Sequence, residues 1–140
     1  MNEYELWVSI YNRATSDTGA GGLFETGDNL ITGFYNTQAP PGAVYPYVVF
    51  SVASATPDDT FAKNVIRYQV RFTCWTGVDA GMQISSQVMD RIYARFHRYG
   101  LSISGGWTAS TMRLLDGAGR TFDDEAYGVI HDYEVYLTGA

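Results

Sequence analysis

Cysteine is nearly absent from this 140-residue chain, which contains Cys74 and no other thiol. A lone cysteine cannot form a disulfide within the chain, and it cannot supply the paired thiolates of a structural zinc site. Neither histidine, His97 or His131, lies in a helical metal-binding motif. We therefore expect no metal site and no cofactor.

Basic residues are also scarce. Nine Lys and Arg stand against fifteen Asp and Glu, the formal net charge is −6, and no basic run occurs. Because affinity for DNA or RNA depends on basic groups that neutralise phosphates, we expect no specific nucleic-acid binding. A ring through which DNA passes is still compatible with this charge, since passage needs only weak contacts.

Long apolar runs are missing as well. The N-terminal segment carries early acidic residues and lacks the apolar run and cleavage site of a signal peptide, and no stretch approaches the length of a membrane span. The sequence therefore predicts a protein without membrane contact that stays in the cytoplasm of the cell that makes it.

Apolar and aromatic residues, in contrast, are plentiful. Hydrophobic residues make up 46% of the chain and aromatic residues 15%, with eleven tyrosines. This content fills one core in a single domain that spans residues 1–140. Tyrosine is enriched where one protein surface meets another, so the composition favours assembly.

The clearest pattern in the chain lies in residues 66–75, where apolar and polar side chains alternate with a period of two. This period is typical of a strand with one buried face, which we place at the centre of the sheet. The predicted core side consists of Ile66, Tyr68, Val70, Phe72 and Cys74. The opposite side consists of Arg67, Gln69, Arg71, Thr73 and Trp75.

The other predicted elements are two helices and several strands. A first helix, capped by Asn2, runs to about Ala14, and a second covers residues 80–99 and ends at Gly100. The first helix is expected to bury Trp7, Ile10, Tyr11 and Ala14. Further strands are predicted at residues 31–36, 47–53, 107–115 and 126–137, with a turn at residues 116–119. The order predicts an α+β fold: an antiparallel sheet of four to five strands with two helices packed on one face.

No group of residues in the sequence is arranged for catalysis. The position of Cys74 on the core side of its strand predicts a small buried hydrophobe, not a nucleophile. The acidic groups at residues 58–59 and 123–125 are interpreted as solvated loops. We expect His131 to lie in the core or at an edge of the sheet, and His97 to be a solvated cation at the end of the second helix. We therefore predict that the protein is not an enzyme.

The outward side of the central strand has two interpretations. If the last strand is its neighbour, Asp132 and Glu134 form cross-strand ion pairs with Arg67 and Arg71. An ordinary mixed-charge surface and a subunit interface that includes Trp75 both fit this pattern.

Several motifs together resemble a known family. Residues 45–50 (YPYVVF) follow a Pro-Gly turn, and a polar loop then leads to the strand at residues 67–72 (RYQVRF). A helix, residues 112–115 (MRLL), a glycine turn and the closing strand around residues 133–135 (YEV) follow. This order, from residue 4 to 137, resembles the tail terminator proteins of long-tailed bacteriophages, which are also called tail completion proteins.

The resemblance implies a structural role in the virion, at the tail or neck, after assembly in the host cytoplasm. Members of this family form a ring, typically a hexamer, that docks on the last ring of the tail tube. The ring stops tube polymerisation and offers a surface to the head–tail connector. The implied partners are copies of the same chain, the tail tube protein and the connector protein.

A cyclic ring joins two different patches head to tail. We assign one patch to the outward sheet face at Arg67, Arg71 and Trp75, and the other to the loop around Asp58, Asp59 and Phe61. We expect an Arg71→Glu chain to fold as a monomer and to form no ring.

Two other functions fit the sequence less well. A head–tail connector or adaptor protein would share the size and composition of a tail terminator. A small α+β domain that binds a metabolite would need polar groups among its core positions, and here these are almost entirely apolar.

Overall fold

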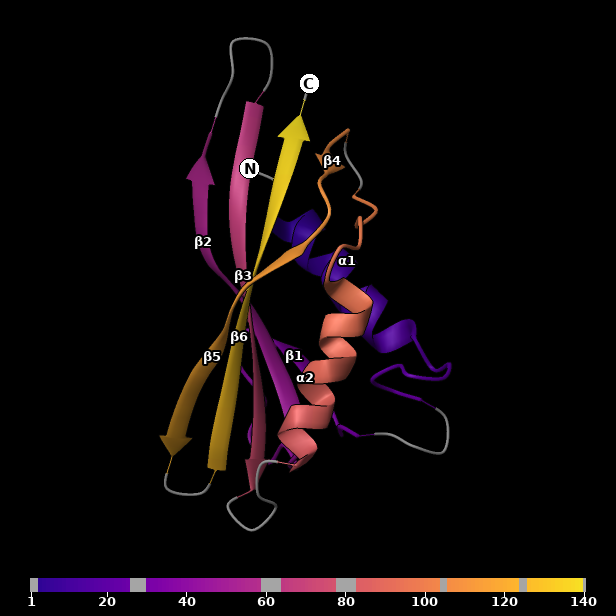
Figure 1. The fold of residues 1–140 in the computed structure, drawn as a ribbon, viewed down its shortest axis with the longest axis vertical. Helices are drawn as coiled ribbons and strands as arrows, with labels where there is room; N and C mark the ends of the chain where they lie inside the picture. Colours follow the sequence, from indigo (N-terminus) through magenta and orange to yellow (C-terminus); the bar gives the residue numbers. More distant parts are fainter. Residues whose placement is uncertain are drawn as a thin grey trace.

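In the computed structural model, two helices lie on one side of a curled, six-stranded sheet (Figure 1). The structure describes residues 3–25, 30–58, 64–77, 83–103, 106–123 and 126–139. The helices are α1 (Glu3–Ser16) and α2 (Gln83–Phe96). The strands are β1 (Phe34–Asn36), β2 (Tyr47–Pro57), β3 (Asn64–Gly77), β4 (Thr108–Ala109), β5 (Arg113–Asp123) and β6 (Ala126–Gly139).

The strand order is β1-β2-β3-β6, and both β4 and β5 pair with the other edge of β6. Every pair is antiparallel except β1 and β2, which run parallel. Strand β3 is central, since it pairs with β2 along one edge and with the full length of β6 along the other. The predicted α+β class and the two helices on one face are confirmed. The sheet was predicted to be antiparallel with four to five strands, whereas it has six, of which β1 and β2 run parallel.

The core lies between the sheet and the two helices. The predicted core side of β3 is confirmed, because its apolar residues from Tyr68 to Cys74 have no exposed surface. Phe72 is at the centre, with ring centroids 5.2 Å from Phe96 of α2 and 5.4 Å from Tyr133 of β6. The helices contribute Leu6, Ile10 and Ala14 from α1 and Val88, Met89, Ile92 and Phe96 from α2.

The buried side of α1 differs from the prediction, since Leu6 is buried and Trp7 is only partly buried. Its buried residues are Leu6, Ile10 and Ala14, whereas Tyr11 is 40% exposed. Apolar residues occupy more than one side of this helix, so the spacing alone did not determine which side faces the sheet. The predicted cap, Asn2, lies outside the described residues.

Two predicted boundaries were wrong. Helix α2 ends at Phe96 and not near Gly100, because Arg98 takes the left-handed conformation (φ 61°) and its N–H donates to the carbonyl of Met112 at 2.7 Å. The predicted turn at residues 116–119 instead lies within β5, where the register with β6 shifts twice. No helix in the described residues is both long and apolar enough to cross a membrane.

Candidate subunit interface

One face of the sheet is left uncovered by the helices. Both described helices lie on the other side, against the buried residues of β3 (Figure 1). We call the uncovered surface the outer face. The residues on this face are Tyr47, Val49 and Ser51 of β2, Arg67, Gln69, Arg71, Thr73 and Trp75 of β3, Arg113 of β5, and Gly128, Ile130, Asp132, Glu134 and Tyr136 of β6.

One end of the outer face is charged. The side chain of Arg71 binds Asp132 with two hydrogen bonds, Nε to Oδ1 at 2.9 Å and an Nη2 to Oδ2 at 3.2 Å. The hydrogen bond and the charge of Asp132 raise the pKa of Arg71. Gln69 also donates to Oδ2 of Asp132, at 3.2 Å. The expected cross-strand pair is therefore present, with a more specific geometry than an ordinary surface pair.

Glu134 is held by two arginines. Its carboxylate lies 2.8 Å from Nε of Arg67 and 2.7 Å from an Nη of Arg113. Only 7% of the Glu134 side chain and 12% of the Asp132 side chain are exposed, because the arginines cover them. The contribution of Arg113 was not predicted, since it depends on the register of β5, which the sequence did not indicate.

This geometry changes one expectation about Arg71. In an Arg71→Glu chain, a second carboxylate would face the nearly buried Asp132, and like charges directly opposite on a sheet are destabilising. Arg71 therefore supports folding, and Arg71→Glu is not a clean test of assembly.

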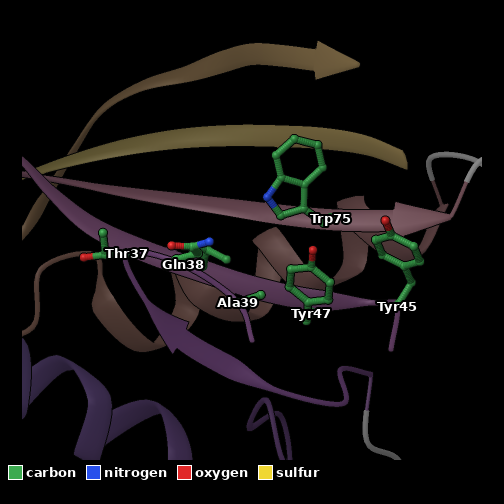
Figure 2. A pocket seen from close by; sticks show the side chains of 7 residues that line it. Thr37, Gln38, Ala39, Tyr45, Tyr47 and Trp75 are labelled. Atoms are coloured by element: carbon green, nitrogen blue, oxygen red, sulfur yellow. The ribbon is translucent and has the colours of Figure 1, made fainter. Parts of the chain in front are cut away.

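The other end of the outer face is aromatic (Figure 2). The rings of Tyr45 and Tyr47 are stacked with centroids 5.4 Å apart, and Tyr35 meets Tyr47 edge to face at 5.7 Å. The rings of Tyr45 and Tyr47 border an open hollow of about 310 Å³. The hollow is lined by Thr37, Gln38, Ala39, Tyr45, Tyr47, Val49 and Trp75.

Trp75 lies across the neighbouring strand at Gly128. A Cβ atom at Gly128 would lie 3.1 Å from the Trp75 ring and 2.6 Å from a methyl group of Thr121. The absence of a side chain at Gly128 therefore allows the indole to lie flat over β6. Aromatic and arginine side chains side by side are typical of the residues that dominate protein–protein binding energy.

The second predicted patch is only partly described. Asp58 is exposed just beyond β2, and its N–H donates to the carbonyl of Val65 at 2.7 Å. Asp59 and Phe61 lie outside the described residues. The structure thus places Arg67, Arg71 and Trp75 on one face. Asp58 lies at the loop end of the β2–β3 hairpin, near Arg67 and far from Trp75.

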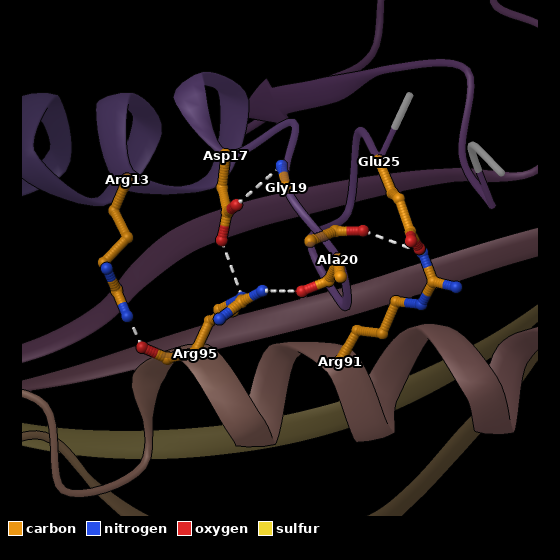
Figure 3. A network of polar contacts seen from close by, with 8 residues as sticks. Arg13, Asp17, Gly19, Ala20, Glu25, Arg91 and Arg95 are labelled. Atoms are coloured by element: carbon orange, nitrogen blue, oxygen red, sulfur yellow. Dashed lines mark hydrogen bonds and ion pairs between the residues drawn. The ribbon is translucent and has the colours of Figure 1, made fainter. Parts of the chain in front are cut away.

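The loop after α1 is tied to α2 by two arginines (Figure 3). Arg95 forms an ion pair with Asp17 at 2.6 Å and donates to the carbonyl of Ala20 at 2.5 Å. Arg91 forms an ion pair with Glu25 at 3.3 Å and donates to the carbonyl of Gly22 at 2.7 Å. These contacts were not predicted from the sequence, because contacts with a distant loop leave no local pattern.

The candidate reactive residues are in structural positions. Cys74 has no exposed surface, and burial raises the pKa of its thiol to about 12. His97 does not stand free in solvent as was expected, since its Nδ1 accepts a hydrogen bond from the N–H of Leu114 at 3.1 Å. Its ring also stacks on Tyr93, with centroids 4.4 Å apart. Among the described residues, no three His, Cys, Asp or Glu side chains are grouped as metal ligands.

Known structures share this fold. A chain from the virion of a native gene transfer agent particle superimposes with a TM-score of 0.81, at 14% identity, over 99% of this chain and 98% of that one. A second solved structure gives a TM-score of 0.61 at 15% identity, over 98% and 96% of the two chains. No curated protein matches the sequence.

The family, in contrast, is established from sequence. The family model described as tail completion protein gp17 matches residues 25–138, which include every strand of the sheet except the last residue of β6. The chain therefore belongs to the tail completion protein gp17 family and is a structural, non-enzymatic component of a virion.

Proposed function

We propose that this chain forms the ring that ends a tail tube, with six copies in the ring. The ring docks on the last ring of tube protein, stops polymerisation, and offers its opposite surface to the head–tail connector. Family membership supports a place in tail completion. The finer role rests on the surface of the sheet.

The observation that carries the proposal is the composition of the outer face. Arginines and a tryptophan stand on it, a hollow bordered by Tyr45 and Tyr47 opens at one end, and no described helix covers it. Tyrosine, tryptophan and arginine are the residues most enriched at binding hot spots. A broad, rigid surface of this kind fits permanent contact with another protein.

A closed ring needs a second, different patch on each copy. We assign part of it to the end of the β2–β3 hairpin, where Asp58 is exposed and where Asp59 and Phe61 follow in the sequence. An acidic hairpin end complements the arginines Arg67 and Arg71 of the neighbouring copy. The net charge of −6 also supports weak contact with DNA that passes through the ring.

Two measurements on the purified protein test this function. Light scattering and negative-stain microscopy should reveal rings, either alone or at one end of tail tubes assembled from the tube protein. Tube protein that polymerises in the presence of the chain should give shorter tubes that stop growing at the capped end. Unchanged tube length, together with no binding to tube ends, would refute the proposal.

The outer face is tested separately with a variant that does not touch the ion pairs. Tyr47→Ser removes a wall of the hollow, and we expect it to weaken ring formation while the chain remains folded. Tyr93→Ser on α2 is the matched control, because Tyr93 is 43% exposed and lies on a helix that faces away from the outer face. Equal assembly of both variants would exclude the hollow from the interface.

A further inference from the structure

Helix α1 carries a second apolar stripe that its own sheet covers only in part, where the Tyr11 ring lies 6.3 Å from that of Phe34 in β1. Tyr4, Val8 and Tyr11 follow the i, i+4, i+7 spacing of one helix side, away from the buried Leu6 and Ile10. Tyr4 is 64% exposed, Tyr11 is 40% exposed, and Val8 is half-buried. A helix with apolar residues on two sides commonly packs between two surfaces, and here only one is present.

The charges near this stripe complement the outer face. Glu3 and Glu5 lie in the first turn of α1, beside Tyr4. On the outer face, 42% of the Arg67 side chain and 44% of the Arg71 side chain remain exposed although both bind carboxylates. Opposite charges at the margin of an apolar contact fix its orientation and favour the correct partner.

The spans of the two surfaces also agree. From Glu3 to Tyr11, α1 rises about 12 Å at 1.5 Å per residue. From Arg71 to Trp75, β3 extends about 13 Å at roughly 3.3 Å per residue. A helix laid along β3 can therefore place Glu3 beside Arg71 while Tyr11 reaches the aromatic hollow.

The two surfaces cannot meet within one chain. Helix α1 lies on the core side of the sheet, and the outer face lies on the other (Figure 1). Contact between them must join different copies, and head-to-tail contacts of this kind form a ring when the rotation between copies closes.

We propose that α1 of one copy packs on the outer face of the next copy, with Tyr4, Val8 and Tyr11 against the aromatic hollow and the central strand. This contact rests on the proposed ring and identifies its second patch more fully. Helix α1 begins in the same half of the molecule as the end of β2, so both can contribute to one side of the contact (Figure 1).

Serine substitutions on α1 test the contact. Tyr4→Ser and Tyr11→Ser should each weaken association of the copies at least tenfold, as measured by analytical ultracentrifugation. Tyr4 is 64% exposed, so thermal unfolding of Tyr4→Ser, monitored by circular dichroism, should change little. The same measurement on Tyr11→Ser reports any loss of stability from its contact with Phe34. Tyr93→Ser is again the matched control and should leave association unchanged. Association of the α1 variants equal to that of the control would overturn the proposal.

Disulfide trapping identifies the surface that α1 touches. A Tyr11→Cys chain is mixed with a Val49→Cys chain, because Val49 lines the hollow. Mild oxidation should link the two variants at least tenfold faster than it links Tyr93→Cys with Val49→Cys. The native Cys74 does not compete, since it has no exposed surface.

The outcomes separate this contact from the ring itself. Intact rings without Tyr11–Val49 trapping would refute the packing of α1 and leave the proposed function standing. Trapping of the Tyr11→Cys chain on a cysteine-bearing tube protein instead of on Val49→Cys would assign the stripe to that partner and overturn the proposal. Absence of rings, both in solution and on tubes, would end both proposals.

Discussion

Arg71 and Asp132 stand opposite each other on β3 and β6, and the guanidinium binds both oxygens of the carboxylate, at 2.9 and 3.2 Å. The carboxylate is 12% exposed and the arginine 44%. The arginine therefore serves two purposes: one edge neutralises a nearly buried acid, and the rest of the side chain forms part of the outer face. A surface of this kind is costly to alter, since each change to it also affects folding.

The first prediction concerns this pair. We expect Arg71→Ala to lower the free energy of unfolding by about 1–3 kcal/mol, because Asp132 would be left without its charged partner. Urea unfolding measures the loss. Adding Asp132→Asn should recover much of it, and a double-mutant cycle gives the coupling between the two residues.

Arg67→Ala provides the comparison. Glu134 would keep its contact with Arg113, so the loss should stay below about 1 kcal/mol. A larger effect for Arg67→Ala than for Arg71→Ala would contradict the importance given to the paired hydrogen bonds.

The second prediction concerns the close approach at Gly128. A methyl group there would lie 2.6 Å from Thr121 and 3.1 Å from the Trp75 ring. Gly128→Ala should cost about 1–3 kcal/mol and turn the indole, which tryptophan fluorescence and near-ultraviolet circular dichroism detect. Gly77→Ala is the control, because its Cβ would meet only Tyr45, at 3.8 Å.

Alternation along residues 66–75 was sufficient to predict the central strand and both of its faces, since strand geometry sends successive side chains to opposite sides. The ion pairs with Asp132 and Glu134 followed from the same alternation. Register was harder to predict. Local turn chemistry favoured a turn at residues 116–119, but pairing with the 14-residue β6 draws these residues into β5.

Two features of the candidate interface depended on tertiary contacts. Tyr11 looked like a core residue because α1 has apolar positions on two sides, and only packing against the sheet selects between them. The contacts of Arg91 and Arg95 were not predicted, because their partners lie in a loop about 70 positions earlier in the chain. Contacts over such separations are set by the fold and cannot be derived from spacing.

The third prediction concerns that loop. Arg95→Ala removes the ion pair with Asp17 and the hydrogen bond to Ala20, and we expect a loss of about 1–2 kcal/mol. Amide exchange in residues 17–25 should accelerate more than exchange in the sheet. Arg98→Ala removes the same charge from an exposed position, and equal acceleration in both variants would contradict a specific role for Arg95.

The fourth prediction concerns the end of α2. Arg98 has a φ of 61°, a conformation that a side chain with a Cβ adopts at a cost of about 1–2 kcal/mol. Arg98→Gly should relieve this strain and raise the free energy of unfolding by about 0.5–1 kcal/mol. Arg98→Ala keeps the Cβ and should leave stability nearly unchanged, so equal gains in the two variants would indicate a charge effect instead.

The last prediction concerns the pH dependence of stability, to which Cys74 contributes. Burial raises the pKa of this thiol from 9.0 to about 12, so the folded protein keeps the proton at pH values where the unfolded chain loses it. The contribution is complete below pH 9 and is lost as the pH rises from 9 towards 12, by about 1 kcal/mol for each pH unit. Burial and the charge of Tyr93 also raise the pKa of Tyr133, which acts in the same direction.

Denaturant unfolding of Cys74→Ala should show lower stability at pH 7 but a shallower decline between pH 9 and 11 than the unmodified chain. Tyr133→Phe should retain the part of the decline that Cys74 causes. Parallel curves for Cys74→Ala and the unmodified chain would show that the buried thiol does not control this decline.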